Sequence, residues 1–146
     1  GIDYFVFDND HYFRKNNEEI IEYKDLPVYR FDGGVIEHED LTVYKLNTDE
    51  YTVWDRNDIS ARFMVLKSRN ATVKVPAGTF TNCLEFATDL AFKNGQWTTL
   101  SEDGGVFEWL APNVGLVKRV RITAVEPITY ELQSAVVNGV KYPIVK

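Results

Sequence analysis

The chain has 146 residues, which is the length of one ordinary domain. Hydrophobic residues make up 45% and charged residues 26%, values typical of a globular protein and not of a disordered one. The net charge of −6 repels phosphate backbones, and no apolar stretch is long enough for a membrane helix. We therefore expect a single domain over residues 1–146, with no nucleic-acid partner and no membrane-spanning segment.

Strand-favouring segments recur along the whole chain, and 20 of its residues are aromatic. The segments are 2–7, 19–23, 26–31, 41–46, 50–54, 62–66, 71–75, 83–92, 96–101, 106–110, 116–125, 128–137 and 140–145. Asn94-Gly95 and Asn138-Gly139 are typical hairpin turns. This pattern predicts an all-β fold: an antiparallel curved sheet, a sandwich or a half-open barrel.

Evidence for helix is limited to one short segment. Asn16 could cap a single turn that runs to Tyr23, and the stretch from Pro76 to Cys83 could close into a helical loop. We therefore expect at most one short helix.

Alternation of apolar and polar residues is clearest in two consecutive segments of the second half. Val120 and Ile122 share one face of the first, and Arg119 and Arg121 share the other. Pro127 would make the bend before the next strand, in which Glu131 would face Arg119 or Arg121.

Two turn segments carry a resemblance to known proteins. The first is Val73-Lys74-Val75-Pro76-Ala77-Gly78-Thr79-Phe80-Thr81-Asn82-Cys83-Leu84. The second is Ala111-Pro112-Asn113-Val114-Gly115-Leu116-Val117-Lys118, followed by Glu131-Leu132-Gln133-Ser134. Over residues 71–134 the chain resembles an uncharacterised group of bacterial secreted and lipoprotein-type β domains, although Asn113 stands where that group more often has glycine.

The resemblance implies an extracellular or cell-surface location, and it implies no catalytic residue. The chain starts at Gly1 without a recognisable leader, which fits either a processed end or a trimmed one. Its one cysteine, Cys83, can form no disulfide within the chain. Because no base neighbours it in the sequence, we interpret Cys83 as a small core residue and not as a nucleophile.

Metal binding has weak support. His11 and His38 are the only histidines, too few for a zinc site that has no second cysteine. Asp8, Asn9 and Asp10 form an oxygen-rich segment that could hold calcium, but the EF-hand spacing is absent. We therefore predict no metal and no cofactor, and leave calcium at Asp8 and Asp10 open.

Catalytic patterns are also absent. No nucleophile elbow, phosphate-binding loop or dinucleotide motif occurs in the sequence. Carboxylates that could form a glycosidase pair are present, but sequence does not give their separation, and a solvated acidic surface explains them. They are Glu37, Glu39, Asp40, Glu108 and Glu131. We predict that the protein is not an enzyme.

Asn70 begins an Asn-Ala-Thr sequence, the pattern that accepts N-linked glycans, at an expected loop before a strand. A glycan there would require a source cell that makes one. Aromatic residues are dense in the first 54 positions. Core packing explains most of them, and an exposed platform for a sugar, an apolar ligand or another subunit is the alternative.

The N-terminal segment determines the functional hypothesis. Its apolar residues Ile2, Tyr4, Phe5, Val6 and Phe7 form a strand that must pair somewhere, either in its own sheet or with a neighbouring copy that exchanges residues 1–8. The first hypothesis is a structural subunit that assembles with copies of itself into a filament by strand addition. The alternative is an envelope binding module that holds an apolar or carbohydrate ligand in a β cup.

Overall fold

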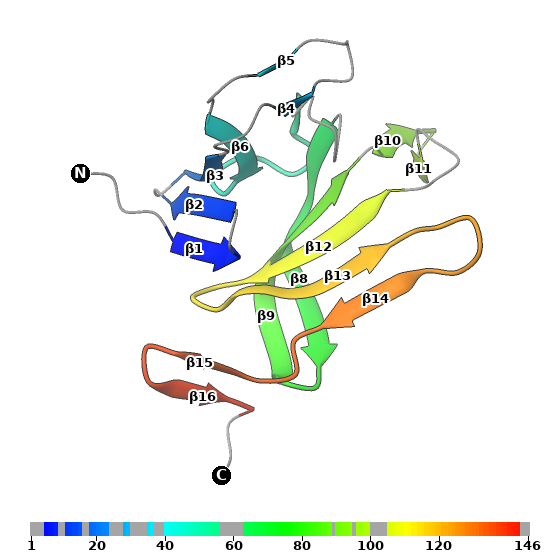
Figure 1. Cartoon of the computed structure of the whole chain (residues 1–146). Coiled ribbons are helices and arrows are strands. Elements are labelled where there is room, and N and C mark those ends of the chain that lie inside the picture. The colour runs from blue at the N-terminus through cyan, green and yellow to red at the C-terminus, as the bar shows by residue number, and fades with distance from the viewer. Residues whose placement is uncertain are drawn as a thin grey trace.

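The computed structural model describes residues 5–8, 11–15, 18–23, 28–29, 35–36, 40–55, 63–88, 90–94, 96–99 and 105–143. Every regular element in these ranges is a β-strand, and all strand pairs are antiparallel (Figure 1). The all-β prediction is therefore confirmed. In the described ranges there is no helix of the length and apolarity needed to cross a membrane.

The first half of the chain forms a four-stranded sheet. Its members are β1 (Phe5–Asp8), β2 (His11–Lys15), β3 (Glu19–Tyr23) and β6 (Asp40–Lys45), in the order β1-β2-β3-β6. The predicted helical turn that ends at Tyr23 is wrong, because Glu19–Tyr23 pairs with strands on both sides. Asn16 lies outside the described residues.

The second half forms a six-stranded sheet in the order β14-β13-β12-β9-β8-β7. The sheet is open: its end strands β14 and β7 do not pair with each other. The strands are β7 (Val53–Asp55), β8 (Phe63–Val75), β9 (Gly78–Thr88), β12 (Val106–Ala111), β13 (Gly115–Arg121) and β14 (Ile128–Glu131).

Three small strand pairs complete the described part. They are β4 (Val28–Tyr29) with β5 (Val35–Ile36), β10 (Leu90–Lys93) with β11 (Gln96–Thr99), and β15 (Ala135–Val137) with β16 (Val140–Tyr142). The hairpins predicted at residues 94–95 and 138–139 are confirmed by the pairing of the flanking strands. Asn138 and Gly139 have φ of 49° and 80°, so both central residues have the positive φ that a tight hairpin turn requires.

The long β8–β9 hairpin corrects two predictions at once. Residues 63–66 of one predicted segment and residues 71–75 of the next belong to one continuous strand, and the expected helical loop after Pro76 is a tight turn. Val75 pairs with Gly78, so only Pro76 and Ala77 form the turn. Proline ends the strand because it has no N–H for the ladder, which confirms its predicted role.

Asn82 makes a bulge in β9. Ala71 pairs with Cys83, but Val73 pairs with Phe80, so β9 has one more residue than β8 between these pairs. Asn82 takes a φ of 53°, which asparagine tolerates better than most residues. The bulge returns Phe80 to the same face as Cys83, and both side chains are buried there.

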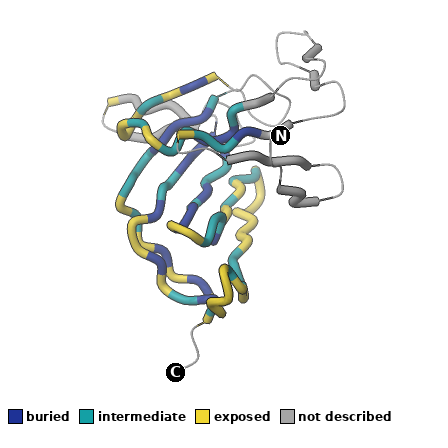
Figure 2. The backbone as a smooth tube through the Cα atoms, turned by 90° about the vertical axis from the view of Figure 1, so that its left-hand side faces the viewer, coloured by how far each residue is buried: buried dark blue, intermediate teal, exposed yellow. Residues whose placement is uncertain are grey.

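Two of the hydrophobic cores that the described residues form lie on opposite faces of the six-stranded sheet. The first contains Phe86 and Leu110, and the second contains Cys83 and Ala111. Because successive side chains of a strand point to opposite faces, Leu110 and Ala111 must serve different faces. Figure 2 shows buried residues along the β8–β9 hairpin, and they continue into its turn, where Ala77 is 1% exposed.

The first core joins the two sheets. Tyr44 and Val43 of β6 pack with residues of the large sheet, and Phe86 lies at the centre of this contact. Its ring centroid is 4.9 Å from that of Tyr44 and 6.0 Å from that of Trp54. The second core is covered by the C-terminal hairpin, whose Tyr142 ring lies 5.6 Å from that of Phe80.

Candidate functional site

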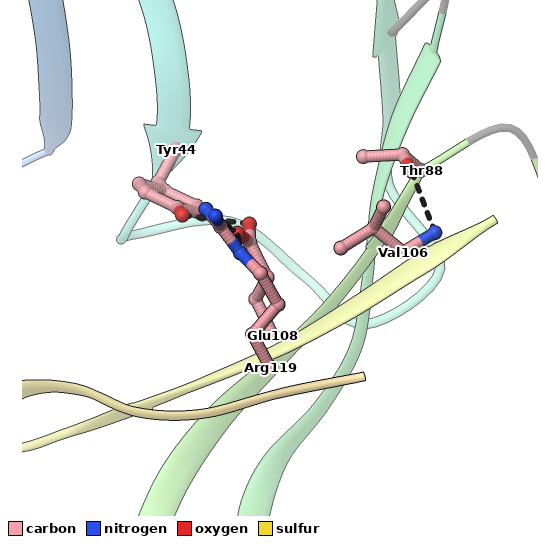
Figure 3. A network of polar contacts seen from close by, with 5 residues as sticks. All are labelled: Tyr44, Thr88, Val106, Glu108 and Arg119. Atoms are coloured by element: carbon pink, nitrogen blue, oxygen red, sulfur yellow. Dashed lines mark hydrogen bonds and ion pairs between the residues drawn. The ribbon is translucent and has the colours of Figure 1, made fainter. Parts of the chain in front are cut away.

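A buried polar network lies where β6 crosses the large sheet. The hydroxyl group of Tyr44 donates a hydrogen bond of 2.6 Å to Oε2 of Glu108 on β12. Nε of Arg119, on the neighbouring strand β13, donates one of 2.6 Å to Oε1 of the same carboxylate. The second guanidinium nitrogen, Nη2, also contacts Oε1, and Figure 3 shows the three side chains converging.

The network holds a charge that is almost completely removed from water. Glu108 is 4% exposed, whereas the Arg119 side chain is 47% exposed. Burial lowers the pKa of the Arg119 guanidinium, but the charge and hydrogen bonds of Glu108, with help from Tyr44, outweigh burial and raise that pKa. Both carboxylate oxygens of Glu108 already accept hydrogen bonds, so the group holds β6, β12 and β13 together.

Two further buried polar groups lie close to this network in the fold. Oγ1 of Thr88 accepts a hydrogen bond of 2.9 Å from the N–H of Val106, at the start of β12 (Figure 3). Nε1 of Trp54 is buried and has no acceptor among the described residues. A buried unpaired donor costs about 1–3 kcal/mol.

Sequence reasoning missed this network, although a signal for it was present. Glu108 alternates with Val106 and Leu110 and therefore lies on an apolar face of its strand. A carboxylate in such a position must be paired, which points to a cation on the neighbouring strand. Glu108 was considered only as half of a glycosidase pair. The cation is Arg119, which lies directly opposite in the register.

The predicted partner of Glu131 is corrected by the same register. Glu131 lies opposite Lys118, and the two charged groups are 3.0 Å apart. Arg119 lies opposite Tyr130 on that side and binds Glu108 on the other. The prediction was wrong by one residue, and a one-residue shift places a side chain on the opposite face.

The N-terminal strand lies in its own sheet. Phe5 pairs with Phe13 and Val6 with Tyr12, so residues 5–8 have a partner within the chain. This is the intramolecular alternative; exchange of the strand with a neighbouring copy stays a prediction. β1 is nevertheless an end strand of its sheet. Ile2 and Tyr4 lie outside the described residues.

Other candidate residues are only partly covered by the structure. Asn9, Asp10, Glu37, His38 and Glu39 lie outside the described residues, so their predicted roles stay untested. Within the described ranges no group of three or more His, Cys, Asp or Glu side chains could hold a metal ion.

Asn70 is exposed, but its expected position in a loop is wrong. It lies within β8, at a stretch where the register with β9 is irregular. Its N–H donates a hydrogen bond of 3.2 Å to Oγ of Ser68. A glycan at Asn70 stays a prediction.

Cys83 is a core residue, as predicted. Its side chain is fully buried, and burial raises the pKa of the thiol above its ordinary value of 9.0. The thiolate is the reactive form, so both access and ionisation oppose chemistry at this sulfur.

We expect Cys83 to react with maleimide about a hundredfold more slowly in the folded chain than in urea. The folded thiol also keeps its proton at pH values where the unfolded thiol loses it. The free energy of unfolding should therefore fall as the pH rises above about 9, and Cys83→Ala should reduce that fall. Equal labelling rates in the folded and unfolded states would contradict the burial.

The end strand β14 carries two exposed apolar side chains. Ile128 is 42% and Tyr130 60% exposed, and both alternate onto the same face of the strand. Nearby in the chain, Val125 is 94% exposed. No other described strand pairs with the outer side of β14.

No known protein family, curated protein or solved structure matches the chain.

Proposed function

We propose that the protein is a non-enzymatic structural subunit, extracellular or in the cell envelope, that associates with copies of itself by adding strands at open sheet edges. The observation that carries the proposal is the outer edge of β14, which no other described strand pairs with and beside which Ile128 and Tyr130 are exposed. An edge strand that nothing covers promotes association, because its unpaired N–H and C=O groups can form hydrogen bonds with a strand of another chain. The location follows from the resemblance of the two turn segments to secreted domains.

A further end strand among the described strands supports extension beyond a dimer. β1 ends the four-stranded sheet, and β14 ends the six-stranded one. In Figure 1 the two strands lie in different parts of the molecule. A subunit with two separate contact edges can continue into a filament, whereas a subunit with one edge stops at a dimer.

The absence of enzymatic activity is part of the proposal. Glu108, the most deeply buried carboxylate of the part that the structure describes, has both oxygens engaged by Tyr44 and Arg119. A general base needs a free oxygen within reach of a substrate proton. Cys83 is buried and poorly ionised.

The alternative, a β cup that holds a ligand, has less support from the described residues. The space between β6 and the large sheet is filled by Phe86, Met64 and Leu66, each 0% exposed. A ligand would have to displace these side chains. Native mass spectrometry that detects a co-purifying apolar molecule or sugar would favour this alternative.

Sedimentation velocity from low to high micromolar concentration tests the proposal. We expect the mean sedimentation coefficient to rise with concentration, with species larger than a dimer at the upper end. Deletion of Ile2–Phe7 should remove the larger species, and thermal melting of that variant reports whether it still folds. A wild-type protein that stays monomeric throughout would contradict the proposal.

A further inference from the structure

The backbone of β14 presents a defined set of groups to solvent. The N–H of Leu132 donates to the carbonyl of Val117, so Leu132 points toward β13. Backbone groups of an antiparallel strand alternate in direction. Tyr130 and Ile128 therefore also bond toward β13, and Thr129 and Glu131 point outward.

The neighbouring ladder agrees with this assignment. The N–H of Ile122 donates to the carbonyl of Gly105, so even-numbered residues at this end of β13 bond toward β12. Odd-numbered residues of β13 then bond toward β14, in agreement with the direction of Val117. The outer edge of β14 thus offers the N–H and C=O groups of Thr129 and Glu131.

We infer that the partner of this edge is β14 of a second copy, antiparallel to the first and related to it by a twofold axis at Thr129. The inference rests on the proposed self-association and names its contact. Each Thr129 would exchange two hydrogen bonds with its counterpart. Each Glu131 N–H would donate to the carbonyl of Pro127 in the partner.

The exposed side chains fit this register. On one face, Ile128 of each copy lies directly opposite Tyr130 of the other, in the closer, non-hydrogen-bonded type of pair. Pairs of aromatic and β-branched residues stabilise antiparallel sheets by about 0.2–1 kcal/mol each. On the other face Thr129 lies opposite its counterpart, and no like charges lie opposite each other.

The register shifted by one position, with the axis at Tyr130, fits less well. It would place Ile128 opposite Leu132 of the partner. Leu132 packs with the core on the opposite face of the sheet, and its carbonyl accepts a hydrogen bond of 3.0 Å from Ala77. Ile128 of both copies would then have no apolar partner.

Arginines flank the paired apolar side chains. Arg119 lies opposite Tyr130 and Arg121 opposite Ile128 within each chain. In the dimer, four side chains would lie side by side across the joined sheets. They are Arg119 and Tyr130 of one copy, followed by Ile128 and Arg121 of the other. The apolar pair closes at the centre of this row. At the two ends, the Arg119 guanidinium stays bound to Glu108 and the Arg121 side chain stays exposed.

Two changes at Thr129 test the inference. Thr129→Pro removes an outward N–H without removing a bond to β13, so the melting temperature should change little. The dissociation constant of the dimer should rise by about tenfold or more, because each copy loses a hydrogen bond to the other. Thr129→Ser keeps the N–H and should stay within about threefold of the wild type.

Cross-linking gives an independent result. Cα atoms of a hydrogen-bonded antiparallel pair are about 5.5 Å apart, within the range that a disulfide spans. Thr129→Cys should therefore form a covalent dimer under mild oxidation, whereas Thr79→Cys, an exposed position on β9, should not. The native Cys83 is buried and does not compete.

The outcomes separate this inference from the proposed function. Association that persists in Thr129→Pro, without cross-linking of Thr129→Cys, would overturn the β14 contact and leave self-association standing. A wild-type chain that never associates would overturn both.

Discussion

Phe86→Ala is expected to lower the free energy of unfolding by about 3–5 kcal/mol, the usual cost of deleting a buried phenylalanine ring. Phe86 is 0% exposed and contacts the rings of Tyr44 and Trp54. Its loss leaves a cavity where the four-stranded and six-stranded sheets meet. Urea unfolding followed by tryptophan fluorescence measures the effect.

Phe107→Ala is the matched control for this change. Phe107 is on the next strand and only partly buried, where it packs against Val65 and Ala87 on the opposite face. We expect the free energy of unfolding to fall by about 1–2 kcal/mol, because folding removes less apolar surface from water at Phe107 than at Phe86. An equal or smaller loss for Phe86→Ala would contradict the central role of the first core.

Arg119→Met is expected to lower the free energy of unfolding by about 2–3 kcal/mol. The change leaves the carboxylate of Glu108 buried with only the Tyr44 hydroxyl as a partner among the described contacts. The cost arises from the unpaired charge. Adding Glu108→Leu to Arg119→Met should therefore cost less than the sum of the two single changes. A double-mutant cycle in urea measures this coupling.

Lys118→Met provides the control on the same strand. Lys118 pairs with Glu131 at 3.0 Å, but both side chains are partly exposed. Such a pair contributes less than about 1 kcal/mol. If Lys118→Met and Arg119→Met lower the free energy of unfolding by similar amounts, Arg119 does not stabilise the buried carboxylate of Glu108.

The fold class could be predicted because its signals are local. The Asn138-Gly139 turn, the strand end at Pro76 and the turn at Asn113, where φ is 61°, all depend on a few adjacent residues. Asparagine, glycine and proline restrict the backbone in known ways, and the structure has the corresponding turns.

Strand register could not be predicted from the same information. Glu131 pairs with Lys118 and not with an arginine, because register depends on how whole strands align. The single strand β8 was predicted as two segments, because the polar residues 67–70 interrupt its apolar pattern. Those residues lie in a continuous strand with an irregular register.

The buried network needed contacts between distant segments. Tyr44 and Glu108 are 64 positions apart, and no sequence spacing brings them together. The position of Glu108 on an apolar strand face indicates a buried charge. Which hydroxyl and which cation satisfy it depends on the packing of β6 onto the large sheet.

Amide hydrogen exchange at β14, measured over a range of protein concentrations, shows directly whether the outer edge of this strand binds a second copy. Tyr130 bonds within the sheet, so its amide should be protected at every concentration. Protection of Thr129 and Glu131 should be low in dilute protein and should rise as the chains associate. Rapid exchange of both amides at all concentrations, with the chains associated, would contradict the use of this edge.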